Sequence, residues 1–262
     1  MVPKPRNLIL NLLLGSGGAP LSARAAVASC ALFGLRENTV RVALVRLAAA
    51  GLVEAAGRGA YRLGPNAAQL AADVATWRGA AQRLHDWDGG WIAVHAGPLG
   101  RSDRAALRAR DRALGLVGLR ELERGLHLRP DNLIGGVDAA RARLFKLGLE
   151  PEAAVFIARG LDAGREARAH TLWDGAALDR GYRDTQARLD DWLARADGLE
   201  LEVAARESFL LGNDAIRQLV FDPLLPAPLV DADARHRFID AVVRFDAAGQ
   251  AIWKRFQEET TP

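Results

Sequence analysis

The side chains best suited to chemistry in this sequence are arginines and an asparagine gathered in its first quarter. In RENTVRVALVR, which starts at position 36, they recur at intervals that place them on one side of a helix. Arginine and asparagine bind guanine and adenine through paired hydrogen bonds in the DNA major groove. The predicted reading face comprises Arg36, Asn38, Thr39, Arg41, Val42 and Arg46. We therefore expect this segment to contact duplex DNA.

Some of these side chains, and two in the following segment, suit weaker contacts. Thr39 and Val42 match thymine methyl groups or a phosphate, and Arg46 lies far enough along to meet the DNA backbone. Arg58, between two glycines, and Arg62 lie in AAGRGAYRL, from which they would reach phosphates or an adjacent groove. Taken singly, such arginines are more typical of a solvated helix face and an ordinary turn.

The distribution of charge favours the DNA interpretation. Residues 1–65 hold eight basic side chains and two acidic ones, Glu37 and Glu54, whereas the other 197 residues hold 27 basic and 30 acidic. Positive charge concentrated in one segment is typical of a polyanion-binding surface. The chain prefers arginine to lysine, 32 to three, but that preference does not explain why acids are scarce here.

The elements that position these residues follow from apolar spacing and glycines. The predicted helices are residues 8–14, 22–32 and 37–50. In the third helix, Val40, Leu44 and Leu47 share one buried stripe, which turns the arginine face outward. LVEAA and AYRL then form a hairpin around two glycines. This order predicts a winged helix-turn-helix over residues 1–65.

The rest of the chain separates into three segments, and the predicted fold class is α+β. Residues 66–85 are predicted to form a connecting helix. Residues 86–170 follow the order βαββαβ, which favours a ferredoxin-like domain for dimerisation and sensing. Residues 171–262 are predicted to form a helical C-terminal domain.

Composition and missing motifs disfavour membrane, secreted and catalytic classes. No apolar run reaches the roughly 18 residues that a membrane helix needs. Cys30 is the single cysteine, so no intramolecular disulfide or cysteine zinc cluster can form, and the cytoplasm is the expected location. The five histidines are scattered without metal-ligand spacing, and no nucleophile-elbow or phosphate-loop motif occurs. We expect no enzyme activity, metal or cofactor.

Tryptophans and arginines of the later segments suggest a ligand pocket. Trp91 and Trp173 could line a pocket for an aromatic or acyl ligand, with Arg129 or Arg143 meeting its anionic portion. Packing in the core or at a dimer contact is the competing interpretation for each tryptophan. Spacing alone does not choose between them.

Several ordered stretches resemble the PaaX-type family, bacterial repressors of phenylacetic acid degradation genes. They are LRENTVRVALVRLAAAGLV, WDGGWIAVHAG, GLHLRPDNL, LLGNDAIRQLVFDPLLPAPLVDADAR and AIWKRF. Together they span almost the whole chain, and WDG, LRPDNL and DPLLP carry most of the specificity. The wing AAGRGAYRL is shorter and less basic than the family's usual hairpin, which indicates a divergent member.

The resemblance implies both architecture and activity. It implies a winged helix, a ferredoxin-like domain similar in fold to CRISPR-associated endoribonucleases, and a helical C-terminal domain. It also implies a homodimer that represses a catabolic operon by binding a double-stranded operator. An aryl-acyl-CoA effector such as phenylacetyl-CoA would release it from DNA.

Two alternatives belong to other classes. One is a protein-interaction adaptor that retains a degenerate winged helix. The other is a ferredoxin-like nuclease, which would be expected to place an acidic metal ligand at the end of its first strand, where WIAVHAG offers His95 and no carboxylate.

Overall fold

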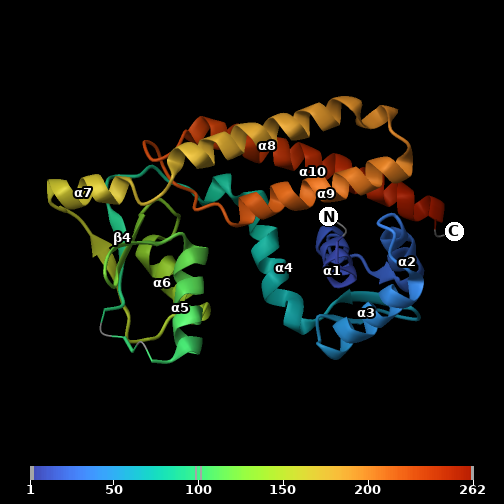
Figure 1. The fold of residues 1–262 in the computed structure, drawn as a ribbon, viewed down its shortest axis with the longest axis horizontal. Coiled ribbons are helices and arrows are strands. Elements are labelled where there is room, and N and C mark those ends of the chain that lie inside the picture. Colours follow the sequence, from blue (N-terminus) through green and yellow to red (C-terminus); the bar gives the residue numbers. More distant parts are fainter. Residues whose placement is uncertain (1–2, 98, 101, 261–262) are drawn as a thin grey trace. The chain divides into compact units, whose positions relative to one another are not determined.

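The computed structural model describes residues 3–97, 99–100 and 102–260, which form helices and two small antiparallel sheets (Figure 1). The predicted α+β class is confirmed. The chain divides into two compact units, each assembled from distant segments. The first unit comprises residues up to Arg78, Gln186–Val220 and residues from Asp240 onward, and the second comprises Gly79–Thr185 and Phe221–Ile239.

The α-helices are α1 (Pro5–Gly15), α2 (Ala23–Ala31), α3 (Glu37–Ala49), α4 (Ala68–Ala75), α5 (Arg104–Val117), α6 (Gly136–Lys146), α7 (Ala163–His170), α8 (Gly175–Arg195), α9 (Leu201–Val220) and α10 (Ala232–Thr260). The strands are β1 (Leu21–Ser22), β2 (Val53–Ala55), β3 (Ala60–Leu63), β4 (Trp91–His95), β5 (Arg120–Glu123), β6 (Leu126–Pro130) and β7 (Ala154–Ala158).

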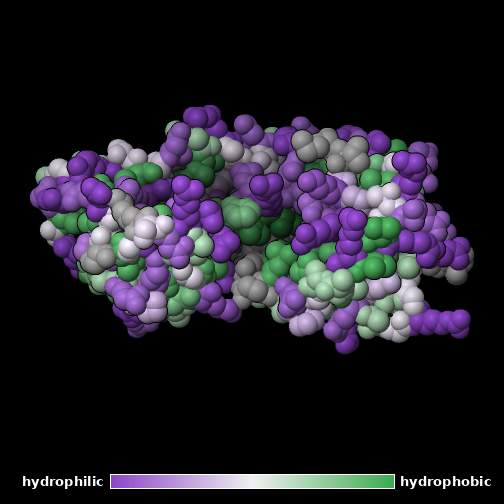
Figure 2. Space-filling model, turned by 60° about the horizontal axis from the view of Figure 1, so that its bottom comes forward, coloured by the Kyte–Doolittle hydropathy of each residue, from purple (hydrophilic) through white to green (hydrophobic). Residues whose placement is uncertain are grey.

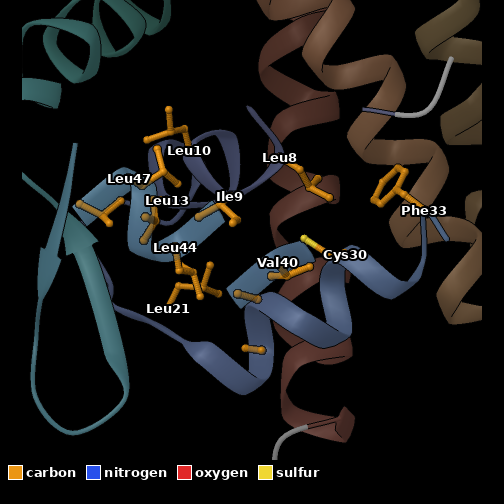
Figure 3. Close-up of a cluster of buried hydrophobic side chains, with 13 residues drawn as sticks. Leu8, Ile9, Leu10, Leu13, Leu21, Cys30, Phe33, Val40, Leu44 and Leu47 are labelled. Carbon is orange, nitrogen blue, oxygen red and sulfur yellow. The ribbon is translucent and has the colours of Figure 1, made fainter. Parts of the chain in front are cut away.

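The first three helices of the first unit pack around one apolar core (Figure 3). α1 contributes Ile9 and Leu13, and α3 contributes Val40, Leu44 and Leu47, all buried. The stripe predicted for the third helix is therefore the face that packs inward. Burying such side chains supplies most of the stability of a short amphipathic helix.

Local signals set the ends of these helices. The Ser22 hydroxyl accepts a hydrogen bond from the Ala25 backbone N–H at 2.9 Å, which caps α2. α3 is followed by Gly51, whose φ of 65° suits glycine. The Asn66 side chain then donates to the Ala50 carbonyl at 2.9 Å and satisfies an acceptor beyond the helix end.

The small sheet of this unit has the order β1-β3-β2. β2 and β3 form the expected hairpin, with Glu54 opposite Arg62. β1, where Leu21 pairs with Tyr61, was not predicted from the sequence. A two-residue strand has no periodicity of its own, and its partner is distant in sequence.

Residues 66–85, expected as one connecting helix, are broken into shorter pieces. α4 is preceded by a 3-10 turn at Pro65–Ala67 and followed by further 3-10 turns at Thr76–Gly79 and Ala81–Arg83. Gly79 disfavours a continuous helix, and the interrupted backbone buries Trp77.

Aromatic contacts join the N-terminal part of the first unit to its long helices. Phe33, after α2, meets Phe209 of α9 edge-on with ring centroids 5.4 Å apart, and Phe209 in turn meets Trp253 of α10 at 6.1 Å. Trp192 of α8 packs on Phe245 of α10 at 4.9 Å. Such pairs add stability beyond the area they bury.

The second unit contains a four-stranded antiparallel sheet in the order β5-β6-β4-β7. Its elements follow one another as β-α-β-β-α-β from β4 to β7. Helices α5 and α6 cover one face, where Ile92 and Val94 pack with Leu114 and Leu144. Because alternate residues of a strand face opposite sides, Trp91 faces the other side, where its indole N–H approaches Glu166 of α7.

Candidate nucleic-acid interface

The outward face of α3 combines cations, an amide and apolar side chains. Val42 and Val45 are 41% and 66% exposed. Exposed apolar groups among hydrogen-bonding ones suit a surface that meets base edges, including thymine methyl groups. The predicted residues on or just before this helix are all exposed: Arg36, Asn38, Thr39, Arg41, Val42 and Arg46.

Arg41 does not project alone. Its Nε and Nη2 atoms each lie 2.7 Å from Oε1 of Glu37, one helical turn earlier. Both side chains remain about 60% exposed, at 60% for Arg41 and 59% for Glu37. The pair narrows the orientations available to the guanidinium while leaving it accessible.

The start of α3 adds positive polarity. Arg36 is its N-cap residue and, within the described part of the chain, makes no side-chain capping hydrogen bond. Unpaired N–H groups at a helix start carry partial positive charge and attract phosphates. The first turn of α3 therefore presents backbone donors together with Arg36 and Asn38.

The hairpin provides a second, smaller basic surface. Gly57 and Gly59, with φ of 110° and 72°, form a tip that carries the exposed Arg58. Arg62 of β3 forms an ion pair with Glu54 of β2, with Nε 2.7 Å from Oε1. Arg58 is thus the tip cation, and Arg62 is partly neutralised within the sheet.

Two of the four residues predicted to bind an effector lie together in the second unit. Trp91 and Trp173 are buried and stack in parallel, with centroids 6.4 Å apart. The Trp173 indole N–H donates to the Gly118 carbonyl at 3.2 Å. In the described conformation both rings pack inside the unit.

Arg129 is buried deeper than a ligand-binding cation usually is. Its guanidinium donates to the carbonyls of Val117 and Pro223, at 2.5 and 3.5 Å, and to the Asn132 side chain at 3.0 Å. Asn132 also donates to the Leu224 carbonyl at 2.7 Å. These contacts bind LRPDNL to DPLLP, so the donors of Arg129 are used to hold a loop.

Arg143 lies near a second cation, Arg83, which was not among the predicted effector-binding residues. Partial desolvation, followed by the charge of the Arg143 guanidinium, lowers the pKa of Arg83. Burial, reinforced by Arg83, lowers the pKa of Arg129 to about 10. Arg83 could not be identified from sequence because it lies outside the expected strands.

Metal-ligating side chains and apolar helices bear on whether the protein is catalytic or membrane-bound. Among the residues described, no three His, Cys, Asp or Glu side chains converge as a metal site, and no helix is long and apolar enough to cross a membrane.

His95 ends β4 and is exposed. Burial raises the pKa of the Cys30 thiol to about 12, which disfavours thiolate chemistry. Hydrophilic side chains cover much of the face in Figure 2.

An open hollow lies within the first unit, apart from the residues predicted to bind an effector. Its volume is about 420 Å³. Phe256 and Leu32 supply apolar lining, and Glu202 and Arg206 supply charges. The hollow borders α2, which precedes the predicted DNA-reading helix.

Comparisons with known proteins identify relatives of both ends of the chain. Residues 4–67 match the family model described as PaaX-like protein, and residues 173–255 match the PaaX-like protein C-terminal domain. A similar solved structure is the uncharacterized protein Rv0674 from Mycobacterium tuberculosis, with a TM-score of 0.61 and 25% identity, covering 94% of this chain and 99% of that one. No curated protein matches the sequence.

Proposed function

We propose, on the premise that this chain belongs to the PaaX-like protein family, that it regulates transcription by binding an operator in duplex DNA. Members of this family are regulators rather than enzymes. The observation that carries the proposal is the two-sided character of α3. One side is buried through Val40, Leu44 and Leu47, and the other exposes Asn38, Arg41 and Arg46, with Arg36 just before it.

In this proposal the first unit presents a winged helix-turn-helix. α3 enters the major groove, where Asn38 and Arg41 bind base edges and Arg46 binds a phosphate. Arg58 at the hairpin tip contacts a phosphate beside the groove. The second unit is ferredoxin-like and serves dimerisation and sensing, so two copies of α3 bind half-sites about one helical turn apart. Binding represses a catabolic operon in the cytoplasm.

We further propose that an aryl-acyl-CoA such as phenylacetyl-CoA releases the protein from DNA. In this proposal Arg143, together with Arg83, meets an anionic portion of the effector. Trp91 faces the opposite side of the sheet from α6, so it is left out of this pocket. Release follows if the effector favours a domain arrangement with the wrong half-site spacing. The effector must therefore bind the two arrangements with different affinities.

Selection from a random duplex library, followed by footprinting of the enriched sequence, tests DNA binding. The proposal predicts one discrete protected site with two related halves. Enrichment of no sequence would instead favour the adaptor alternative. Cleavage of the library that EDTA and His95→Ala both abolish would favour the nuclease.

A thermal-shift screen with acyl-CoAs and free aromatic acids tests the effector. We expect an aryl-acyl-CoA to raise the unfolding temperature of the wild-type protein and to do so much less for Arg143→Ala. Arg206→Ala is the matched control, because Arg206 borders the hollow of the first unit. Loss of the shift in Arg206→Ala alone would place the effector there and contradict the proposed pocket.

A further inference from the structure

Each carboxylate in the first 65 residues is paired with an arginine that was predicted to bind DNA. Glu37 and Glu54 are the two acidic residues among residues 1–65. Glu37 binds Arg41 and Glu54 binds Arg62, each with a closest contact of 2.7 Å. A carboxylate weakens the attraction of a basic surface for phosphates. The presence of Glu37 and Glu54 on this surface therefore needs an explanation other than phosphate binding.

We propose that Glu37 is a specificity-determining residue that accepts a hydrogen bond from a cytosine amino group while Arg41 binds guanine. The inference rests on the proposed function and deepens it, because it assigns Glu37 and Arg41 a joint preference for a C·G-containing step. Glutamate accepts from cytosine N4, and arginine donates to guanine O6 and N7, in the major groove.

The geometry of the pair leaves atoms available on both partners. Both contacts from Arg41 reach Oε1 of Glu37, so Oε2 lies outside the pair. On Arg41 the contacts use Nε and Nη2, so Nη1 lies outside it. An acceptor and a donor therefore stand side by side on one exposed helix face, matching the donor of cytosine beside the acceptors of guanine.

The position of Glu37 strengthens this assignment. It occupies the first turn of α3, the part of a recognition helix that approaches base edges most closely. A carboxylate there also repels phosphates, so it weakens binding to every sequence that offers no compensating amino group. Glu37 is thereby expected to lower non-specific affinity and raise discrimination together.

A purely structural role is the competing explanation. A carboxylate in the first helical turn interacts favourably with the helix dipole, and an exposed pair four residues apart adds a little stability. Either effect would change helix stability and leave the preferred DNA sequence unaltered. Base preference is therefore the measurement that separates the two explanations.

Glu54 offers a matched control on the hairpin. Glu54→Ala removes the same charge and breaks the same kind of exposed ion pair, with side chains 60% and 42% exposed in Arg62 and Glu54. Its carboxylate lies on the hairpin strand β2, outside the reading helix. Glu54→Ala should raise non-specific affinity without changing the enriched sequence.

The experiment selects sequences from a random duplex library with the full-length wild type, Glu37→Ala, Glu37→Gln and Glu54→Ala. We expect a C·G pair in each wild-type half-site. Discrimination at that pair should fall by roughly tenfold in Glu37→Ala, fall partly in Glu37→Gln, and persist in Glu54→Ala. Replacing that cytosine with N4-methylcytosine keeps the amino hydrogen that pairs with guanine and removes the one exposed in the major groove. This change should weaken wild-type binding and leave Glu37→Ala unaffected.

The possible results distinguish the proposed role of Glu37 from the proposed DNA-binding function. An identical preferred sequence for wild type and Glu37→Ala overturns the inference while DNA binding stands. Equal loss of the preference in Glu37→Ala and Glu54→Ala also overturns it, because the effect would then be one of charge alone. If the wild type enriches no sequence, the proposed function fails and the inference fails with it.

Discussion

Arginine serves two physically different purposes in this chain, and the surroundings of each residue decide which. Arg41 and Arg46 are exposed on α3, whereas Arg110 and Arg129 are buried at 5% and 2% exposure. The excess of basic residues in the first 65 positions predicted that Arg41 and Arg46 belong to an exposed basic surface. It could not show that Arg129 is used internally, because two of its acceptors, the carbonyls of Val117 and Pro223, are distant in sequence.

Arg41→Ala tests whether the exposed arginines of α3 bind DNA bases. Loss of a base contact should weaken operator binding by roughly 1–3 kcal/mol and relax base preference at one position. The effect should be measurable by fluorescence anisotropy at moderate salt. Arg188→Ala, which removes an exposed arginine of α8, is the control. Unchanged operator affinity in Arg41→Ala would show that α3 is not the reading helix.

Glu150→Gln tests a partly buried ion pair in the second unit. Hydrogen bonding to Arg110 lowers the pKa of Glu150 below its ordinary value of 4.5, so ionised Glu150 stabilises the fold. The variant should be less stable than wild type by about 1 kcal/mol above pH 5. That difference should shrink as pH falls below 4.5 through the lowered pKa, because wild-type Glu150 then becomes protonated.

Thermal unfolding of both proteins between pH 3 and pH 7, roughly the range over which carboxylates titrate, measures this difference. Glu152→Gln, at an exposed neighbouring position, is the matched control and should follow wild type throughout. A constant difference between Glu150→Gln and wild type over the whole range would contradict the assignment.

At the scale of elements, the sequence was most informative where periodicity and glycines agree. The third helix was expected over residues 37–50 and is Glu37–Ala49. β1 and the breaks after α4 were not foreseen, because long-range pairing and burial of Trp77 decide them. Likewise LRPDNL and DPLLP were noted as separate motifs, and only the structure shows that they bind one another.

Gly118→Ala tests the junction where these motifs meet the end of α5. Gly118 has φ of 83°, and an added Cβ would lie 3.3 Å from Pro223 and 3.4 Å from Nη1 of Arg129. We expect a loss of about 1–3 kcal/mol in unfolding free energy, from strain and crowding. Urea denaturation measures it.

Gly115→Ala provides the control, since it lies inside the same helix and its added Cβ would meet no described atom within 4 Å. That substitution should stabilise by roughly 0.5–1 kcal/mol, because alanine is the better helix former. Equal effects of the two substitutions would contradict the tight packing inferred at Gly118.

At the scale of the whole molecule, chain order and spatial grouping differ. Residues of α8 and α10 contribute to both compact units. The domains predicted from the sequence end at residues 65, 85 and 170, so each is one continuous segment. Continuous segments cannot represent a compact unit that is assembled from separate parts of the chain. The proposed dimerisation and effector release would therefore involve segments that are distant in sequence.

The central claim is that α3 reads a specific duplex, and salt-dependent binding tests it most directly. Affinity of the wild-type protein for its selected site and for a scrambled duplex should be measured between about 50 and 300 mM salt, where phosphate contacts are screened progressively. The account predicts that both affinities fall steeply with salt and that the selected site is bound about 10³-fold more tightly. Equal affinity for the two duplexes, or binding insensitive to salt, would contradict it.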